Sequence, residues 1–207
     1  MRILVVVALA ACAGAPRPAA KGGPRGLHAD EHLDVAARHA DLARRQTTWP
    51  DTRSAGAGTV AVPWVRSWDP AADHARLAAI HRGKAAELQA AYDEACGARP
   101  VEEVAVSPLH RHGLGGWNTS TGAIVYLSAA AGAADRLIAD LRCHRAWMML
   151  SSKSGMDDCP LDLPGIKVDA RGDTGGITLA IAVDDPKLVE ELHRRIAHEL
   201  EQKADPR

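Results

Sequence analysis

A pattern that occurs twice decides the first half of the fold: HLDVAARHADLA at residues 32–43 and HARLAAIHRGKA at residues 74–85. Both stretches read His-x-x-Val/Leu-Ala-x-x-His-x-x-x-Ala. On an α-helix, residues seven apart lie nearly on one face. Each stretch therefore predicts a helix with a row of histidines beside a seam of small residues. We expect the two helices to pair as an antiparallel hairpin.

The limits of both helices can be read from capping residues and helix breakers. Residues 28–46 contain neither Gly nor Pro and predict the first helix. Residues 71–96 predict the second, with Asp69 as N-cap, Pro70 at the first helical position and Gly97 as the stop. The connection between them, residues 47–70, contains several prolines and glycines and three tryptophans. The predicted hairpin unit spans residues 28–99.

The second half of the chain changes to short strands alternating with helices. Strands are predicted at residues 101–106, 123–128, 166–170 and 176–183, and helices at 133–150 and 187–203. Residues 107–118 are expected to form a loop, and 172–176 a hairpin turn. The order β-β-α-β-β-α predicts an α+β domain over residues 100–203, a sheet with helices on one face, close to a ferredoxin-like sandwich. Residues 204–207 form a tail.

The N-terminus has the pattern of a bacterial lipoprotein signal. Arg2 precedes a short apolar run that ends in Leu9-Ala-Ala-Cys12, which resembles a lipobox. Signal peptides have a basic start and an apolar core of about 7–15 residues, whereas a membrane-spanning helix needs about 20. We predict a signal peptide at residues 1–11, lipidation of Cys12 and a flexible tether over residues 12–27. The chain is then anchored to a membrane, expected to be the outer membrane, and faces the periplasm.

The histidines suggest a transition-metal site. Imidazole is a common ligand of zinc and copper. The candidate ligands are His28, His32, His39, His74 and His81. An i, i+4 pair can chelate one ion directly, whereas residues seven apart are separated by about 10 Å and need help from a facing helix. The alternative is that these histidines line a polar seam or a solvated flank.

Three cysteines remain if Cys12 carries lipid: Cys96, Cys143 and Cys159. In an oxidising envelope this odd number suggests one disulfide and one free or ligated thiol. A Cys143–Cys159 bridge is favoured, and a bridge from Cys96 to either of the others stays open. A second metal or catalytic constellation would combine His144 with these cysteines and with loop histidines.

Composition narrows the function classes. The net charge is −1, so nothing in the chain's overall charge suggests nucleic-acid binding. The sequence contains neither a Gly-x-Ser-x-Gly elbow nor a His-Glu-x-x-His motif, and we predict a protein without enzymatic activity. A pocket that gathers His110, His112 and His144 would favour an enzyme instead.

The second half resembles a group of uncharacterised bacterial envelope lipoproteins. The resemblance rests on the helix from His74 to Cys96, on Val-Ser-Pro-Leu-His ending at His110, on Cys143-His144, and on Cys-Pro-Leu beginning at Cys159. It implies an envelope lipoprotein with recurrent Cys and His positions and no established activity. Two hypotheses follow: a metal-binding lipoprotein, or a structural lipoprotein that binds a protein partner and no ligand.

Overall fold

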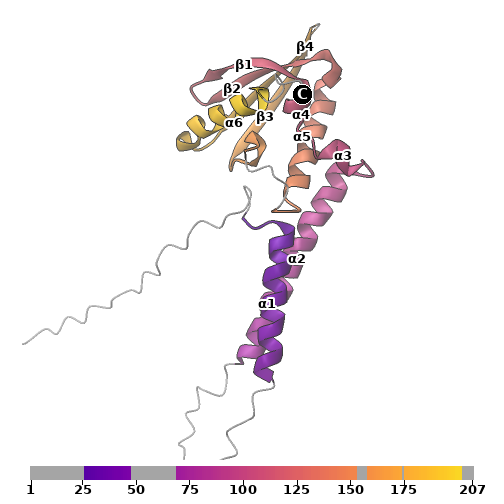
Figure 1. Cartoon of the computed structure of the whole chain (residues 1–207), viewed down its shortest axis with the longest axis vertical. Helices are drawn as coiled ribbons and strands as arrows, with labels where there is room; N and C mark the ends of the chain where they lie inside the picture. Colours follow the sequence, from indigo (N-terminus) through magenta and orange to yellow (C-terminus); the bar gives the residue numbers. More distant parts are fainter. Residues whose placement is uncertain (1–25, 48–68, 153–157, 174, 202–207) are drawn as a thin grey trace, which may run out of the picture.

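The chain forms a helical stalk joined to a small α+β domain. In the computed structural model, the described residues are 26–47, 69–152, 158–173 and 175–201. Two long antiparallel helices project from a four-stranded antiparallel sheet that carries shorter helices (Figure 1). None of the helices in the described ranges is long and apolar enough to cross a bilayer. The predicted signal peptide, Cys12 and most of the tether lie outside the described residues.

The predicted hairpin is confirmed. Helix α1 spans Ala29–Thr47 and helix α2 spans Pro70–Cys96. Alanines spaced by seven residues fill the seam between them, and four of these are buried: Ala29, Ala36, Ala78 and Ala85. Small side chains let the two backbones approach closely. The Asp69 carboxylate accepts hydrogen bonds from the first turn of α2, and Gly97 ends the helix with a positive φ, as the sequence predicted.

The start of α1 is tied to the α+β domain. The main-chain N–H of Ala29 donates to the carbonyl of Met149 over 2.9 Å. The Asp30 carboxylate accepts hydrogen bonds from Ser151 and Ser152. Although burial alone would raise the pKa of Asp30, these hydrogen bonds lower it. The stalk therefore has two attachments to the domain, this cap at α1 and the covalently linked end of α2.

The α+β domain has the order β-β-α-β-β-α. Its strands are β1 (Gly113–Thr119), β2 (Gly122–Ser128), β3 (Ile166–Asp173) and β4 (Gly176–Val183), arranged β1-β2-β4-β3. Helices α5 (Ala134–Met148) and α6 (Val189–Glu201) follow the two hairpins. Short 3-10 turns occupy Ala129–Ala131, Pro160–Asp162 and Pro186–Leu188.

The core lies between one face of the sheet and the helices. Alternate residues of β4 are buried, and Leu179 and Ile181 are almost completely removed from solvent. They meet Leu137 and Leu141 of α5 and Leu192 of α6 in one apolar cluster. The period of two along the strands and the apolar stripes of the helices thus create a single core on one side of the sheet.

One predicted strand is wrong. Residues 101–106 contain helix α3 (Val101–Val104), and the expected loop at 107–118 contains helix α4 (Pro108–His112) and strand β1. Pro100 at the N-cap and acidic residues in the first turn favour the α3 turn, while Ser107 caps α4. Strand β1 has a glycine-rich sequence and is held by its pairing with β2.

The predicted Cys143–Cys159 disulfide is also wrong. Cys96, the last residue of α2, is bonded to Cys143 of α5, while Cys159 is a buried free thiol. Consecutive helical residues point about 100° apart. Cys143 therefore faces the end of α2, whereas its neighbour His144 faces Cys159. The bridge joins the stalk covalently to the domain.

Candidate metal site on the helical hairpin

Four of the five predicted histidines form a column between α1 and α2, called the histidine column below. Nδ1 of His32 lies 2.8 Å from Nδ1 of His81, and Nδ1 of His39 lies 3.0 Å from Nδ1 of His74. The rings of His39 and His81 stack with their centroids 6.1 Å apart, which links the two pairs. The seven-residue spacing on antiparallel helices produces this match, because each histidine meets one from the opposite row.

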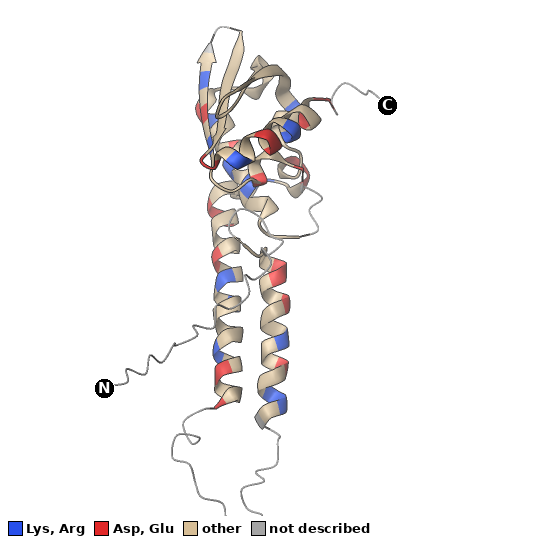
Figure 2. Ribbon diagram, turned by 90° about the vertical axis from the view of Figure 1, so that its left-hand side faces the viewer, with Lys and Arg blue, Asp and Glu red and all other residues tan. Residues whose placement is uncertain are grey.

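The histidine column is partly shielded from water, and the pKa values of two of its members are lowered. Each pair shares one proton between facing Nδ1 atoms, because one imidazole donates its N–H and the other accepts. Partial burial, with repulsion from His74 and His81, lowers the pKa of His39. Partial burial, with repulsion from His32, also lowers the pKa of His81. Other charged side chains lie along the two helices (Figure 2).

His28 does not join the histidine column. Its Nδ1 lies 2.9 Å from a carboxylate oxygen of Glu31, one helical turn along α1. The i, i+4 spacing of His28 and His32 therefore does not produce a chelating pair in this structure. The four remaining histidines approach one another as pairs, and among the described residues no group of three or more His, Cys, Asp or Glu side chains is placed to hold an ion.

Each histidine pair nevertheless approaches the geometry of a two-nitrogen metal site. Zinc binds imidazole nitrogen at about 2.0–2.1 Å, so two nitrogens on a tetrahedral ion lie about 3.3 Å apart. The observed Nδ1–Nδ1 distances of 2.8 and 3.0 Å are slightly shorter. A small rotation of the rings would admit an ion in place of the shared proton, with the donor ring then carrying its proton on Nε2 instead. The other coordination positions of that ion would be open to water or another ligand.

A small cavity lies beside His32, one member of the histidine column. It has a volume of about 260 Å³ and is lined by His32 together with Leu27 and residues of α2. Two of these α2 residues, Lys84 and Glu87, form an ion pair of 2.6 Å on the helix surface. One member of the histidine column, His32, therefore borders a cavity.

The second predicted constellation is assembled in part, within the α+β domain. His144 of α5 is buried, and its Nδ1 donates to the carbonyl of Val104 over 2.7 Å. Nε2 is then the acceptor, and it lies 3.7 Å from the sulfur of Cys159. Burial, aided by the negative charge of Glu199, raises the pKa of the Cys159 thiol to about 12. Because thiolate is the nucleophilic form, this pair is poorly suited to nucleophilic chemistry.

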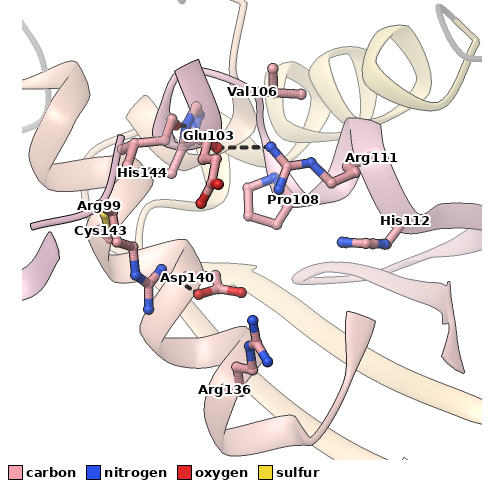
Figure 3. Close-up of a pocket in the computed structure, with 11 residues that line it drawn as sticks. Arg99, Glu103, Val106, Pro108, Arg111, His112, Arg136, Asp140, Cys143 and His144 are labelled. Atoms are coloured by element: carbon pink, nitrogen blue, oxygen red, sulfur yellow. Dashed lines mark hydrogen bonds and ion pairs between the residues drawn. The ribbon is translucent and has the colours of Figure 1, made fainter. Parts of the chain in front are cut away.

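The two histidines predicted to lie in a loop, His110 and His112, do not share a site. His112 and His144 line a cavity of about 520 Å³ beside α3, α4 and α5 (Figure 3), whereas His110 is not among its lining residues. His110 instead faces Glu199 of α6, 3.8 Å from a carboxylate oxygen. Burial raises the pKa of Glu199.

The sequence did not reveal the arginines of this cavity. Arg99, Arg111 and Arg136 all line it, yet they come from three separate segments of the chain. Arginines are frequent along the sequence and carry no motif, so only the fold shows that these three converge.

Comparison of the chain with protein-family models, with curated proteins and with solved structures finds no match.

Proposed function

We propose that the protein is a lipoprotein, anchored by acylated Cys12 in the outer membrane and facing the periplasm, whose hairpin binds copper or zinc between its histidine pairs. The metal interpretation is carried by one observation: Nδ1 atoms from opposite helices face each other twice, at 2.8 and 3.0 Å. The depressed pKa values of His39 and His81 support it further, since metals bind neutral imidazole.

The anchor is supported by the sequence around Cys12. A basic residue, an apolar run too short to span a bilayer, and Leu-Ala-Ala before the cysteine meet the requirements for lipoprotein processing. In a Gram-negative host, labelled palmitate should enter the wild-type protein, and a Cys12→Ser variant should lose both the label and its place in the membrane fraction. Equal membrane association of the variant would contradict the anchor.

Metal binding is tested by native mass spectrometry of the full-length protein in detergent, with Zn²⁺, Cu²⁺ or Cu⁺ added. We expect up to two ions per chain, one for each histidine pair. A His39→Ala/His74→Ala variant should lose one ion and retain the other. A His198→Asn variant, altered on α6 away from the histidine column, serves as the matched control and should bind as the wild type does.

Two outcomes would overturn the proposal. One is the absence of bound ions at micromolar metal. The other is equal binding by the wild type and by a variant in which all four histidines of the column are alanine. Circular dichroism of the same samples would show whether that variant keeps its helices, so a loss of binding through unfolding would be recognised.

The alternative function, a structural lipoprotein that binds a protein partner, is favoured by the outer face of the sheet. Trp117 and Tyr126 are 49% and 43% exposed there, with their ring centroids 5.1 Å apart, and Leu114 nearby is 66% exposed. Exposed aromatic side chains are enriched where proteins meet. A Trp117→Ala/Tyr126→Ala variant that loses a cross-linked envelope partner while retaining its metal would separate the two functions.

We infer a ferredoxin-like class for the α+β domain, in a circularly permuted form. Helix α5 joins β2 to β3, two parallel strands with antiparallel β4 between them, which is the split β-α-β unit of ferredoxin-like domains. Moving the last strand of the β-α-β-β-α-β order to the front gives the β-β-α-β-β-α order of this chain. The strand order β1-β2-β4-β3 is the one expected from that permutation.

A further inference from the structure

We propose that the arginine-lined cavity beside α5 binds a small anionic molecule through its carboxylate or phosphate oxygens. This site is separate from the histidine column and does not depend on the metal proposal. The cavity lies where the end of α2, the α3–α4 segment and α5 meet (Figure 3). Its volume of about 520 Å³ falls within the range of small-molecule sites, about 300–1,000 Å³.

Positive side chains outnumber negative ones around the cavity. Three arginines and two carboxylates, those of Glu103 and Asp140, line it. Arg99 forms an ion pair with Asp140, which leaves two guanidinium groups, those of Arg111 and Arg136, against the single carboxylate of Glu103. Arg111 donates to the main-chain carbonyl of Glu103 over 2.8 Å, which positions the guanidinium without neutralising its charge.

Arg136 has the clearest capacity for an external anion. It precedes Asp140 by one turn of α5, so both side chains lie on the face of the helix that borders the cavity (Figure 3). In the part of the chain that the structure describes, Arg136 makes neither a hydrogen bond nor an ion pair. A guanidinium presents five donors in a planar fork that matches carboxylate and phosphate oxygens.

Two of the residues that line the cavity are bonded to other elements of the fold. Cys143 lines it and is bonded to Cys96, which fixes α5 against the end of α2. His144 lines it as well and is hydrogen-bonded to Val104 of α3. Burial lowers the pKa of His144, and the positive charge of Arg111 lowers it further, so this imidazole is neutral and the arginines supply the positive charge. Arg111, held by its hydrogen bond to Glu103, is a preorganised donor with little ordering cost, whereas Arg136 becomes ordered when the anion binds.

The test uses the full-length protein in detergent, passed over a chelating resin to remove bound ions, so that metal plays no part and no soluble carboxylate competes with the probes. Isothermal titration with inorganic phosphate and with citrate separates phosphate from carboxylate recognition. We expect at least one probe to bind at millimolar concentration or below. Tighter binding of phosphate would identify a phosphate-bearing ligand, and tighter binding of citrate a polycarboxylate.

Variants distinguish the cavity from general surface attraction. Arg136→Gln and, separately, Arg111→Gln should each weaken binding of that probe about tenfold, because each removes a charge-assisted contact. Arg142→Gln, an exposed change elsewhere on α5, is the matched control and should leave affinity unchanged. The proposal is overturned if neither probe binds at millimolar concentration, or if all three variants bind as the wild type does. Arg136 is exposed, so its variant remains informative if Arg111→Gln fails to fold.

Discussion

Removal of the Cys96–Cys143 disulfide should destabilise the protein by about 4 kcal/mol. The bridge closes a loop with a sequence separation of 47 residues. The chain-entropy relation for a loop of this length gives about 4 kcal/mol at 25 °C, through the restriction of the unfolded chain. The appropriate variant is Cys96→Ala/Cys143→Ala, because alanine leaves neither a thiol nor an unpaired hydroxyl in the buried position.

The free energy of unfolding is measured by urea titration, followed by far-ultraviolet circular dichroism. With an m-value of about 2 kcal/mol/M, the expected loss lowers the urea midpoint by about 2 M. Cys159→Ala is the control: it removes a buried sulfur but keeps the bridge, and it should cost less than about 2 kcal/mol. The wild type, the double variant and the Cys159→Ala control are all measured without reductant.

Two results would refute this reasoning. Peptide mapping without reductant that finds a Cys143–Cys159 bridge, or free thiols at all three positions, would contradict the pairing. If the free energy of unfolding of the double variant is within about 1 kcal/mol of the wild-type value, the bridge does not restrict the unfolded chain in the way assumed.

Three further predictions concern the stalk and the core. Because the pKa values of His39 and His81 are lowered in the folded protein, the unfolded chain takes up protons first as pH falls. The stability that these two residues contribute is therefore present above pH 6.5, the ordinary histidine value, and is lost below it. We expect Tm to drop between about pH 7.5 and pH 5.5. A variant with glutamine at both positions should show a smaller drop. Leu179→Ala in β4, where the side chain is 0% exposed, should cost about 2–5 kcal/mol in urea unfolding. Asp69→Ala should cost about 1 kcal/mol, because α2 loses its N-cap; an unchanged urea midpoint would mean that this cap is dispensable.

The hairpin and most of the α+β domain could be predicted because their signals are local and periodic. Seven-residue spacing of His and Ala on two segments implies both the helices and the faces that meet, and the structure places four histidines accordingly. Apolar residues recur in β4 with the period of a strand, and in α5 and α6 with the period of a helix. Their approximate positions followed from the sequence.

Most of the errors fall where tertiary contacts decide the structure, and one falls where two local signals conflict. Strand β1 is rich in glycine and gains its conformation from pairing with β2, which no local pattern shows. A valine at each end of α3 suggested a strand, while Pro100 and two glutamates favoured a helical turn. The disulfide required knowing which side of α5 faces α2. The arginine-lined cavity combines residues 99–112 with residues of α5, and no motif marks their convergence.

Long-range ¹H–¹⁵N NMR of the histidine side chains during Zn²⁺ titration of the full-length protein tests the central claim most directly. The structure aims the Nδ1 atoms of His32, His39, His74 and His81 at one another. The account predicts that Zn²⁺ shifts the Nδ1 resonances of these four residues. All four rings should then be in the Nε2-protonated tautomer, including the ring of each pair that donates through Nδ1 when no metal is bound. Shifts confined to other histidines, or ligation of the four through Nε2, would contradict it.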